Sequence, residues 1–418
     1  RDTRALDSGT LQSWGLIFQF ANDEPLTERP RSFLAESMIP VVAHVFGVGA
    51  TRFVSDVRIA NPNGFEWTAT VIFTRSGEDG NANFLAENVH LEAGATASFD
   101  DIVDSLFHTA GSGSLQVLGP VVTMSRTYAD TPAGTLGQQV PPVRDTTALG
   151  ETPLALGPLP EEGSRYNIGI TELDGHRGVV QIGDRRIEVL PFSHVQFSGD
   201  SRFVTVSVVE GEARVGAYVS QVNAIGDAMF IPAETLSDDG SRSLIAPAIS
   251  VDEWHSDLWF SSAAEVRVIP DALWDGVRQH FGVLGVGPQA GMLAGSRIHS
   301  SRGTDQFIPF AGFHDLIERD QQLLFIETVP PYRTNVGIFN YYAREATAEV
   351  VVYDAAGVEM QREVLRTVNG VAQMPVTAGV SGGRAVVRFL SGLDLGPGFG
   401  YASLIDGRTG DATYIRGQ

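Results

Sequence analysis

The chain has 418 residues, of which 43% are hydrophobic, so it can bury real cores but is too long for one ordinary core and should form roughly two to four domains. Its net charge of −21 would repel phosphate backbones and anionic lipid, so neither nucleic acid nor a membrane surface is an expected partner. Cysteine and lysine are absent, which excludes disulfides, thiolate chemistry and catalytic lysines.

The first segment, residues 1–37, lies outside the repeats described below and is predicted to form an N-terminal arm. It contains an apolar, strand-like run that includes Leu16, Ile17, Phe18 and Phe20. Because a free apolar strand readily pairs with another chain, we expect this arm to pack on a module or on a second copy of the protein. The first residue, Arg1, fits a processed exported chain and equally a trimmed one. No apolar run reaches the roughly 18–20 residues that a membrane-spanning helix needs.

Two short patterns then recur in the same order four times. The opening pattern is an aromatic residue, a small polar residue and alternating apolar positions, found at residues 53–59, 166–170, 254–260 and 332–339. The closing pattern is a polar strand, a loop with Gly or Asp and an apolar pair, found at residues 125–141, 217–232, 296–309 and 402–415. Recurrence of this kind is typical of repeat architectures.

The fourfold recurrence predicts four modules, at residues 38–145, 150–238, 243–315 and 322–418. The third is short for a complete sandwich, so we expect it to share a sheet with a neighbour. Runs rich in β-branched residues alternate with glycine-rich and asparagine-rich turns, which predicts an all-β fold of tandem immunoglobulin-like β-sandwich modules with few short helices. Helices are expected only at residues 99–107, with Asp100 as N-cap, and at 272–281.

Two acidic clusters are candidates for calcium binding. One lies in a predicted hairpin loop and the other on one side of the short predicted helix; their candidate ligands are Asp79, Asn81, Asn83, Asp100, Asp101 and Asp104. Calcium prefers several oxygen ligands from one flexible loop, although neither cluster has EF-hand spacing. Solvated turn and helix-cap carboxylates are the alternative interpretation. The sequence predicts no other cofactor.

The sequence shows no catalytic constellation, and we predict that the protein is not an enzyme. Its nine histidines form no H-x-H or H-E-x-x-H pair. Residues 379–383 match the string G-x-S-x-G, but a strand-like run follows Ser381 where a nucleophile elbow requires a helix, which favours a glycine turn. A hydrolase with a site between modules remains an alternative.

Asp56 and Asp257 occupy matched positions in separate modules, so they are predicted to be structural and to pair with Arg126 and Arg297 of the closing strands.

Exposed aromatic residues provide a second functional alternative, because sugar faces stack on aromatic rings. The candidates are Trp67, Trp254, Trp259 and Trp274. Trp254 and Trp259 lie five residues apart on one strand and therefore face opposite sides, so at least one of them is expected in a core. This hypothesis describes an array of glycan-binding modules.

Residues 39–44 and 55–62, followed by 125–128 and 137–141, resemble a repeat of uncharacterised secreted bacterial proteins with tandem immunoglobulin-like sandwiches. The resemblance covers the first module well and the others loosely, and it implies no catalytic residues. We therefore expect a secreted or cell-surface structural or adhesion protein that self-associates or binds a protein partner, with glycan binding as the alternative.

Overall fold

The computed structural model describes residues 29, 36–47, 51–236, 244–251, 253–271, 280–287, 290–312, 320–340, 345–391 and 398–418. Among these described residues, strands make up 62% and helices 1%, which confirms the predicted all-β, multi-module fold. The apolar run of the N-terminal arm and residues 272–279 of the helix predicted at 272–281 lie outside the described residues. The last two residues of that predicted helix are instead the start of strand β21 (His280–Val286). Among the described residues, no helix is long and apolar enough to cross a membrane.

Module 1 is a single eight-stranded antiparallel sheet in the order β4-β3-β6-β1-β2-β7-β8, with β5 added to β2. Its elements are β1 (Glu36–Phe46), β2 (Arg52–Ala60), β3 (Trp67–Arg75), β4 (Leu85–Leu91), β5 (Thr96–Phe99), α2 (Ile102–Ser105), β6 (Gly111–Leu118), β7 (Val122–Thr131) and β8 (Gly134–Val140). Strand β1 pairs with β6 along most of its length and with β2 at its end. Side chains from β2 and β3 meet in one core, so the sheet folds over on itself.

Module 2 has two sheets, in the orders β13-β10-β15-β16 and β12-β11-β14-β9-β17. Its strands are β9 (Leu154–Leu156), β10 (Arg165–Glu172), β11 (Gly178–Ile182), β12 (Arg185–Val189), β13 (His194–Ser198), β14 (Val204–Gly211), β15 (Val215–Val222), β16 (Ala228–Pro232) and β17 (Glu234–Thr235).

Module 3 has the sheets β21-β18-β24 and β20-β19-β22-β23. Its strands are β18 (Leu244–Ser250), β19 (Trp254–Ser261), β20 (Val266–Ile269), β21 (His280–Val286), β22 (Leu293–Ser300), β23 (Asp305–Ile308) and β24 (Ala311–Gly312). Among the described residues, both sheets contain strands of this segment alone, so the expected sharing of a sheet with a neighbour is not seen.

Module 4 has the sheets β25-β30-β27-β28 and β29-β26-β31-β32. Its strands are β25 (Gln321–Ile326), β26 (Tyr332–Asn340), β27 (Thr347–Tyr353), β28 (Glu359–Arg366), β29 (Val371–Pro375), β30 (Gly383–Ser391), β31 (Gly398–Asp406) and β32 (Ala412–Arg416).

One arrangement recurs in every module, and we call it the inner sheet. Its four strands run in the orders β5-β2-β7-β8, β13-β10-β15-β16, β20-β19-β22-β23 and β29-β26-β31-β32. The second strand carries the opening sequence pattern, and the last two strands carry the closing pattern. The two recurring patterns are therefore adjacent, hydrogen-bonded strands.

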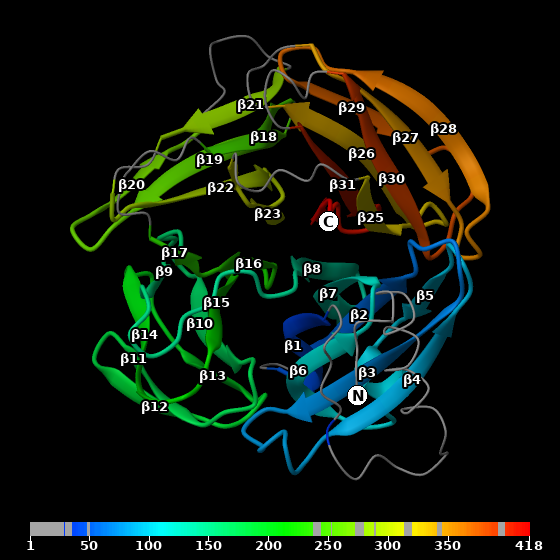
Figure 1. Cartoon of the computed structure of the whole chain (residues 1–418). Helices are drawn as coiled ribbons and strands as arrows, with labels where there is room; N and C mark the ends of the chain where they lie inside the picture. Colours follow the sequence, from blue (N-terminus) through cyan, green and yellow to red (C-terminus); the bar gives the residue numbers. More distant parts are fainter. Residues whose placement is uncertain are drawn as a thin grey trace, which may run out of the picture.

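The four modules form a closed ring (Figure 1). The last strands of the inner sheets, β8, β16, β23 and β32, contact one another in a cycle around the centre. Strands β8 and β23 lead into Pro141 and Pro309, and β16 ends at Pro232; these three prolines line a central cavity of about 190 Å³. Proline has no backbone N–H to donate, so it suits a point where a strand leaves its sheet.

Each module also places side chains in the core of the preceding one. Phe230 of module 2 lies in the core of module 1, Trp259 of module 3 in that of module 2, and Tyr401 of module 4 in that of module 3. Met124 of module 1 completes the cycle in the core of module 4. Since large buried side chains dominate core energetics, the module junctions are extensions of the cores.

The single described helix differs from its prediction. We expected residues 99–107 with Asp100 as N-cap, whereas α2 spans only Ile102–Ser105 and follows Asp101, which has a left-handed backbone with φ 52°. The backbone N–H of Asp101 donates to Asp56 Oδ1 at 2.9 Å, while Asp100 pairs with Arg58 at 2.7 Å. These tertiary contacts fix the turn and move the helix start beyond both aspartates.

Candidate binding clefts between the modules

The repeated Ser-Asp pair of the opening strands holds two turns in place. Ser55 Oγ accepts the backbone N–H of Ala43 on β1, and Ser256 Oγ accepts that of Ile249 on β18, both at 2.8 Å. The adjacent Asp257 accepts the N–H of Asp271, in the same way that Asp56 accepts the N–H of Asp101. Asp101 and Asp271 both have positive φ, so the side chains of Asp56 and Asp257 each stabilise a turn with a strained backbone.

Replacement of Asp56 by alanine should lower thermal stability. The change leaves the N–H of Asp101 and the hydroxyl of Tyr128, which lies 3.2 Å from Asp56 Oδ1, without their acceptor. The expected cost is about 1–3 kcal/mol in the free energy of unfolding. Melting curves of wild type and Asp56→Ala would check this cost. Asn335→Ala, at the matched position in module 4, is the comparison variant. An unchanged melting temperature in Asp56→Ala would refute the structural role.

The predicted pairing of these aspartates with arginines is confirmed in one module and wrong in the other. Arg297 Nε donates to Asp257 Oδ2 at 3.1 Å. Arg126 lies opposite Asp56 in the sheet but donates instead to Asp411 of module 4, at 3.2 Å. Asp411 has no exposed side-chain surface and needs this compensating cation.

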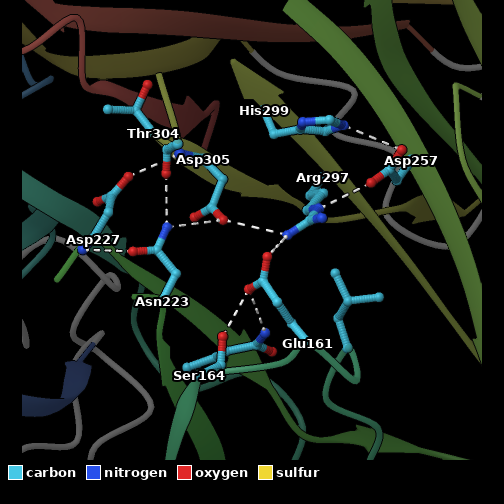
Figure 2. Close-up of polar contacts among 12 residues, drawn as sticks. Glu161, Ser164, Asn223, Asp227, Asp257, Arg297, His299, Thr304 and Asp305 are labelled. Carbon is cyan, nitrogen blue, oxygen red and sulfur yellow. Dashed lines mark hydrogen bonds and ion pairs between the residues drawn. The ribbon is translucent and has the colours of Figure 1, made fainter. Parts of the chain in front are cut away.

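The junction between modules 2 and 3 is filled by a polar network around Arg297 (Figure 2). Besides Asp257, Arg297 contacts Glu161 of module 2 at 3.0 Å and Asp305 at 3.4 Å. The carboxylate of Asp227 accepts the backbone N–H of Asp305 at 2.8 Å, which binds the last hairpin of module 2 to that of module 3.

Burial and charge shift the carboxyl groups of this network in opposite directions. Burial raises the pKa of Asp305 to about 7, although Arg297 opposes the shift. Burial, together with the charges of Asp411 and Asp305, raises the pKa of Asp227. Burial also acts to raise the pKa of Asp257, but His299, the backbone N–H of Asp271 and the charge of Arg297 together outweigh it and bring this pKa to about 2.

Asp305 should make the protein's stability depend on pH. Its folded pKa of about 7 lies above the value near 4 of an unfolded aspartate, so its contribution is fully present below pH 4 and is lost as pH rises through 7. Lowering the pH from 8 to 5 should therefore stabilise wild type relative to Asp305→Asn, on the order of 1–3 kcal/mol. Melting curves of both proteins at the two pH values check this, with Asp200→Asn as an exposed control. A pH-independent difference between wild type and Asp305→Asn would contradict it.

The junction between modules 4 and 1 contains a charged cleft of about 290 Å³. Its carboxylates are Asp56, Asp100 and Glu327, and each has a protein partner. Glu327 accepts hydrogen bonds from Ser381 Oγ and from the backbone N–H of Gly382. In contrast, Glu161 at the junction between modules 2 and 3 binds an arginine. Ser381 lies beside a glycine with φ 63°, in agreement with a turn.

The junction between modules 1 and 2 is uncharged at the matched positions and closed. Asn167 of β10 faces Ser220 of β15, and Gln138 of β8 donates to Ser220 Oγ at 3.3 Å. Nearby, Tyr218 and Ser76 both lie within hydrogen-bonding distance of the ring of His194, and burial lowers the pKa of this histidine to about 4.

The junction between modules 3 and 4 has the same uncharged pair, Asn335 and Ser403, but it opens into a cleft of about 380 Å³. Trp254 lines this cleft from module 3 and is half-buried, whereas Trp259 is fully buried, as their spacing predicts. Trp67 is also buried, and Trp274 lies outside the described residues. The remaining polar lining residues are Gln306, Arg333, Gln373, Tyr401 and Tyr414.

The predicted calcium ligands of the hairpin loop contact module 2. Asp79 forms an ion pair with Arg177 at 2.7 Å, and Asn81 donates to the backbone carbonyl of Gly175 at 2.9 Å. The backbone N–H of Asn83 donates to the carbonyl of Asp79. The structure thus gives this loop a role in the junction, and its calcium binding stays a prediction.

The second predicted calcium cluster is divided. Asp101 and Asp104 come together with His44, with ligand atoms within 4.8 Å of one another, while Asp100 pairs with Arg58 instead. His44 comes from β1, so its contribution could not be seen from local spacing. Calcium at this group also stays a prediction, as does assembly through Leu16, Ile17, Phe18 and Phe20, which lie outside the described residues.

Comparison with known proteins adds no functional assignment. No family model matches the chain, and no curated protein matches it. One solved structure, described as a biofilm-associated protein BSP domain, aligns over 94% of this chain and 98% of its own, at 7% identity and a TM-score of 0.16. A similarity this low does not carry a functional argument.

Proposed function

We propose that the protein is a non-enzymatic, secreted or cell-surface structural and adhesion protein built on a closed ring. The observation that carries the proposal is the cyclic exchange of core side chains, which joins the first module to the last. A ring with shared cores resists the opening of any one module and holds the surfaces of four modules in fixed relation. These properties suit a protein that bears load or presents binding surfaces.

The N-terminal arm is proposed to connect copies of the ring. Light scattering of the full chain and of a variant lacking residues 1–37, each with and without calcium, tests this. The full chain should form a larger species than the shortened variant. Particles of equal mass would exclude the arm as the assembly element, and a calcium-independent mass would argue against a calcium role in assembly. Labelling of intact source cells with an antibody tests the proposed surface location.

Hydrolysis is the competing function, because three carboxylates line the cleft between modules 4 and 1. Their engagement by protein groups favours a structural role: Glu327 Oε2 alone accepts two hydrogen bonds. Incubation with polysaccharide and peptide substrates distinguishes the two functions. Turnover that disappears in both Asp56→Asn and Glu327→Gln would replace the adhesion proposal with a hydrolase.

A further inference from the structure

We propose that the cleft between modules 3 and 4 binds a saccharide unit that carries a carboxylate, such as a uronic acid in a polysaccharide. The inference rests on the proposed function of a non-catalytic binding and adhesion protein, and it names a ligand class for one junction. Four observations support it: the absence of a hydrogen bond that the matching junction has, buried polar atoms without partners, a half-buried tryptophan, and an arginine without an ion-pair partner among the described residues.

The first observation comes from the internal repeat. Gln138 and Gln306 occupy the same position, three residues before the proline that follows β8 and β23. At the junction of modules 1 and 2, Gln138 donates to Ser220. The corresponding partner of Gln306 is Ser403, yet within the described part of the chain neither side chain forms a hydrogen bond. The junction between modules 3 and 4 is therefore open where its counterpart is closed.

The second observation is that two buried polar atoms in the cleft lack partners among the described residues. Tyr414 Oη and Gln306 Oε1 form no hydrogen bond, although their residues are only 5% and 9% exposed. Both residues line the cleft. Gln138 Oε1 at the closed junction also lacks a partner, so Tyr414 Oη is the unpartnered atom that distinguishes this cleft. A buried polar group without a partner costs about 1–3 kcal/mol, so a ligand rich in hydroxyl groups would relieve this cost.

The third observation is the chemistry of the remaining lining. Trp254 offers an aromatic surface on the module 3 side, and sugar C–H faces stack on such rings. Asn335 and Ser403 lie side by side on β26 and β31 of module 4, and Gln373 on β29 faces Gly337, two residues along β26 from Asn335. Amide and hydroxyl groups can donate and accept at once, which matches sugar hydroxyls. The cleft volume of about 380 Å³ suits one saccharide unit with part of its neighbour.

The fourth observation is charge. Arg333 is the only ionised side chain in the lining, and no carboxylate accompanies it. It is exposed and forms no ion pair with the described residues, in a chain with 50 acidic and 29 basic residues. An arginine fork binds a carboxylate through two parallel hydrogen bonds. This feature favours a uronic acid over a neutral or amino sugar.

Isothermal titration of the full chain with trigalacturonic acid and with its methyl ester tests the inference. The ester keeps the hydroxyl groups and the shape but lacks the charge. Wild type should bind the acid at least tenfold more tightly than the ester. Trp254→Ala should weaken binding of both probes at least tenfold, whereas Arg333→Gln should remove the preference for the acid and retain binding of the ester. Ser220→Ala, at the closed junction, is the matched control and should bind as wild type does.

Two outcomes would overturn the inference. One is that neither probe binds at millimolar concentration to a wild-type protein that melts cooperatively. The other is binding that Trp254→Ala and Arg333→Gln leave unchanged, which would place the site elsewhere. Both variants change side chains that are half-buried or exposed, and their melting curves would identify any folding defect. Neither outcome affects the light-scattering and cell-labelling tests, so failure of the ligand inference is distinct from failure of the proposed function.

Discussion

Replacement of Arg126 by methionine is expected to destabilise the protein by about 3–5 kcal/mol and to loosen the contact between its first and last modules. Arg126 is almost completely buried and donates to Asp411 and Thr413 of module 4 and to Thr135 of module 1. Methionine fills a similar volume but leaves Asp411 as a buried charge without its cation. The loss should appear in chemical denaturation and in faster amide hydrogen exchange of β8 and β32.

The pH dependence separates this electrostatic effect from simple loss of packing. Burial raises the pKa of Asp411 to about 6 even beside Arg126, and without the arginine the shift should be larger. The neutral acid then avoids the cost of the unpaired charge, so the Arg126→Met defect should be smaller at pH 5 than at pH 8.

The double variant Arg126→Met/Asp411→Asn should recover part of the stability at pH 8, because it removes both charges. Arg362→Met is the surface control, since Arg362 pairs with Glu349 and Glu359 in an exposed position and should change stability far less than Arg126→Met does. Equal losses for Arg126→Met at both pH values, with no recovery in the double variant, would contradict the role of the ion pair.

The sequence predicts the repeat because each copy preserves the alternation of an inner strand. The prediction is less accurate in the second copy, where the aromatic residue does not occupy the position that the other copies suggest. The sequence pattern matches Tyr166 with Phe53, Trp254 and Tyr332. Strand register instead places Asn167 at the position of Asp56, because Asn167 faces Ser220 as Asp56 faces Arg126. Tyr166 therefore occupies the position of Ser55. Its hydroxyl bonds to the backbone of Leu159 and Glu161, a local substitute for the serine contact.

The clefts could not be predicted because their residues come from different modules. Arg126 and Asp411 are 285 positions apart, and nothing in either local sequence specifies that partner. The same holds for Gln306 and Ser403. The hydrogen bond that they lack is noticed only when their junction is compared with that of Gln138 and Ser220. Local spacing did predict that Trp254 and Trp259 face opposite sides, since this depends only on strand alternation.

Replacement of Gly295 by alanine is expected to be the most damaging single-methyl change at a junction. Gly295 of β22 faces Trp259 of β19, and a Cβ at residue 295 would lie 2.1 Å from two atoms of the indole ring. The ring cannot withdraw, because it is fully buried in the core of module 2 and its Nε1 donates to the carbonyl of Gly157 at 3.0 Å. Relief of the clash must therefore move the junction between modules 2 and 3.

Overpacking of this kind typically costs about 1–3 kcal/mol, and loss of the Trp259 hydrogen bond would add about 1 kcal/mol. Chemical denaturation measures the loss, and tryptophan fluorescence reports movement of the indole. Gly285→Ala is the matched control, because Gly285 is an exposed strand glycine with no atom within 4 Å of an added Cβ. Equal stability of both variants and wild type would contradict this prediction. The close approach of Trp259 to the backbone would then not be what holds module 3 against module 2.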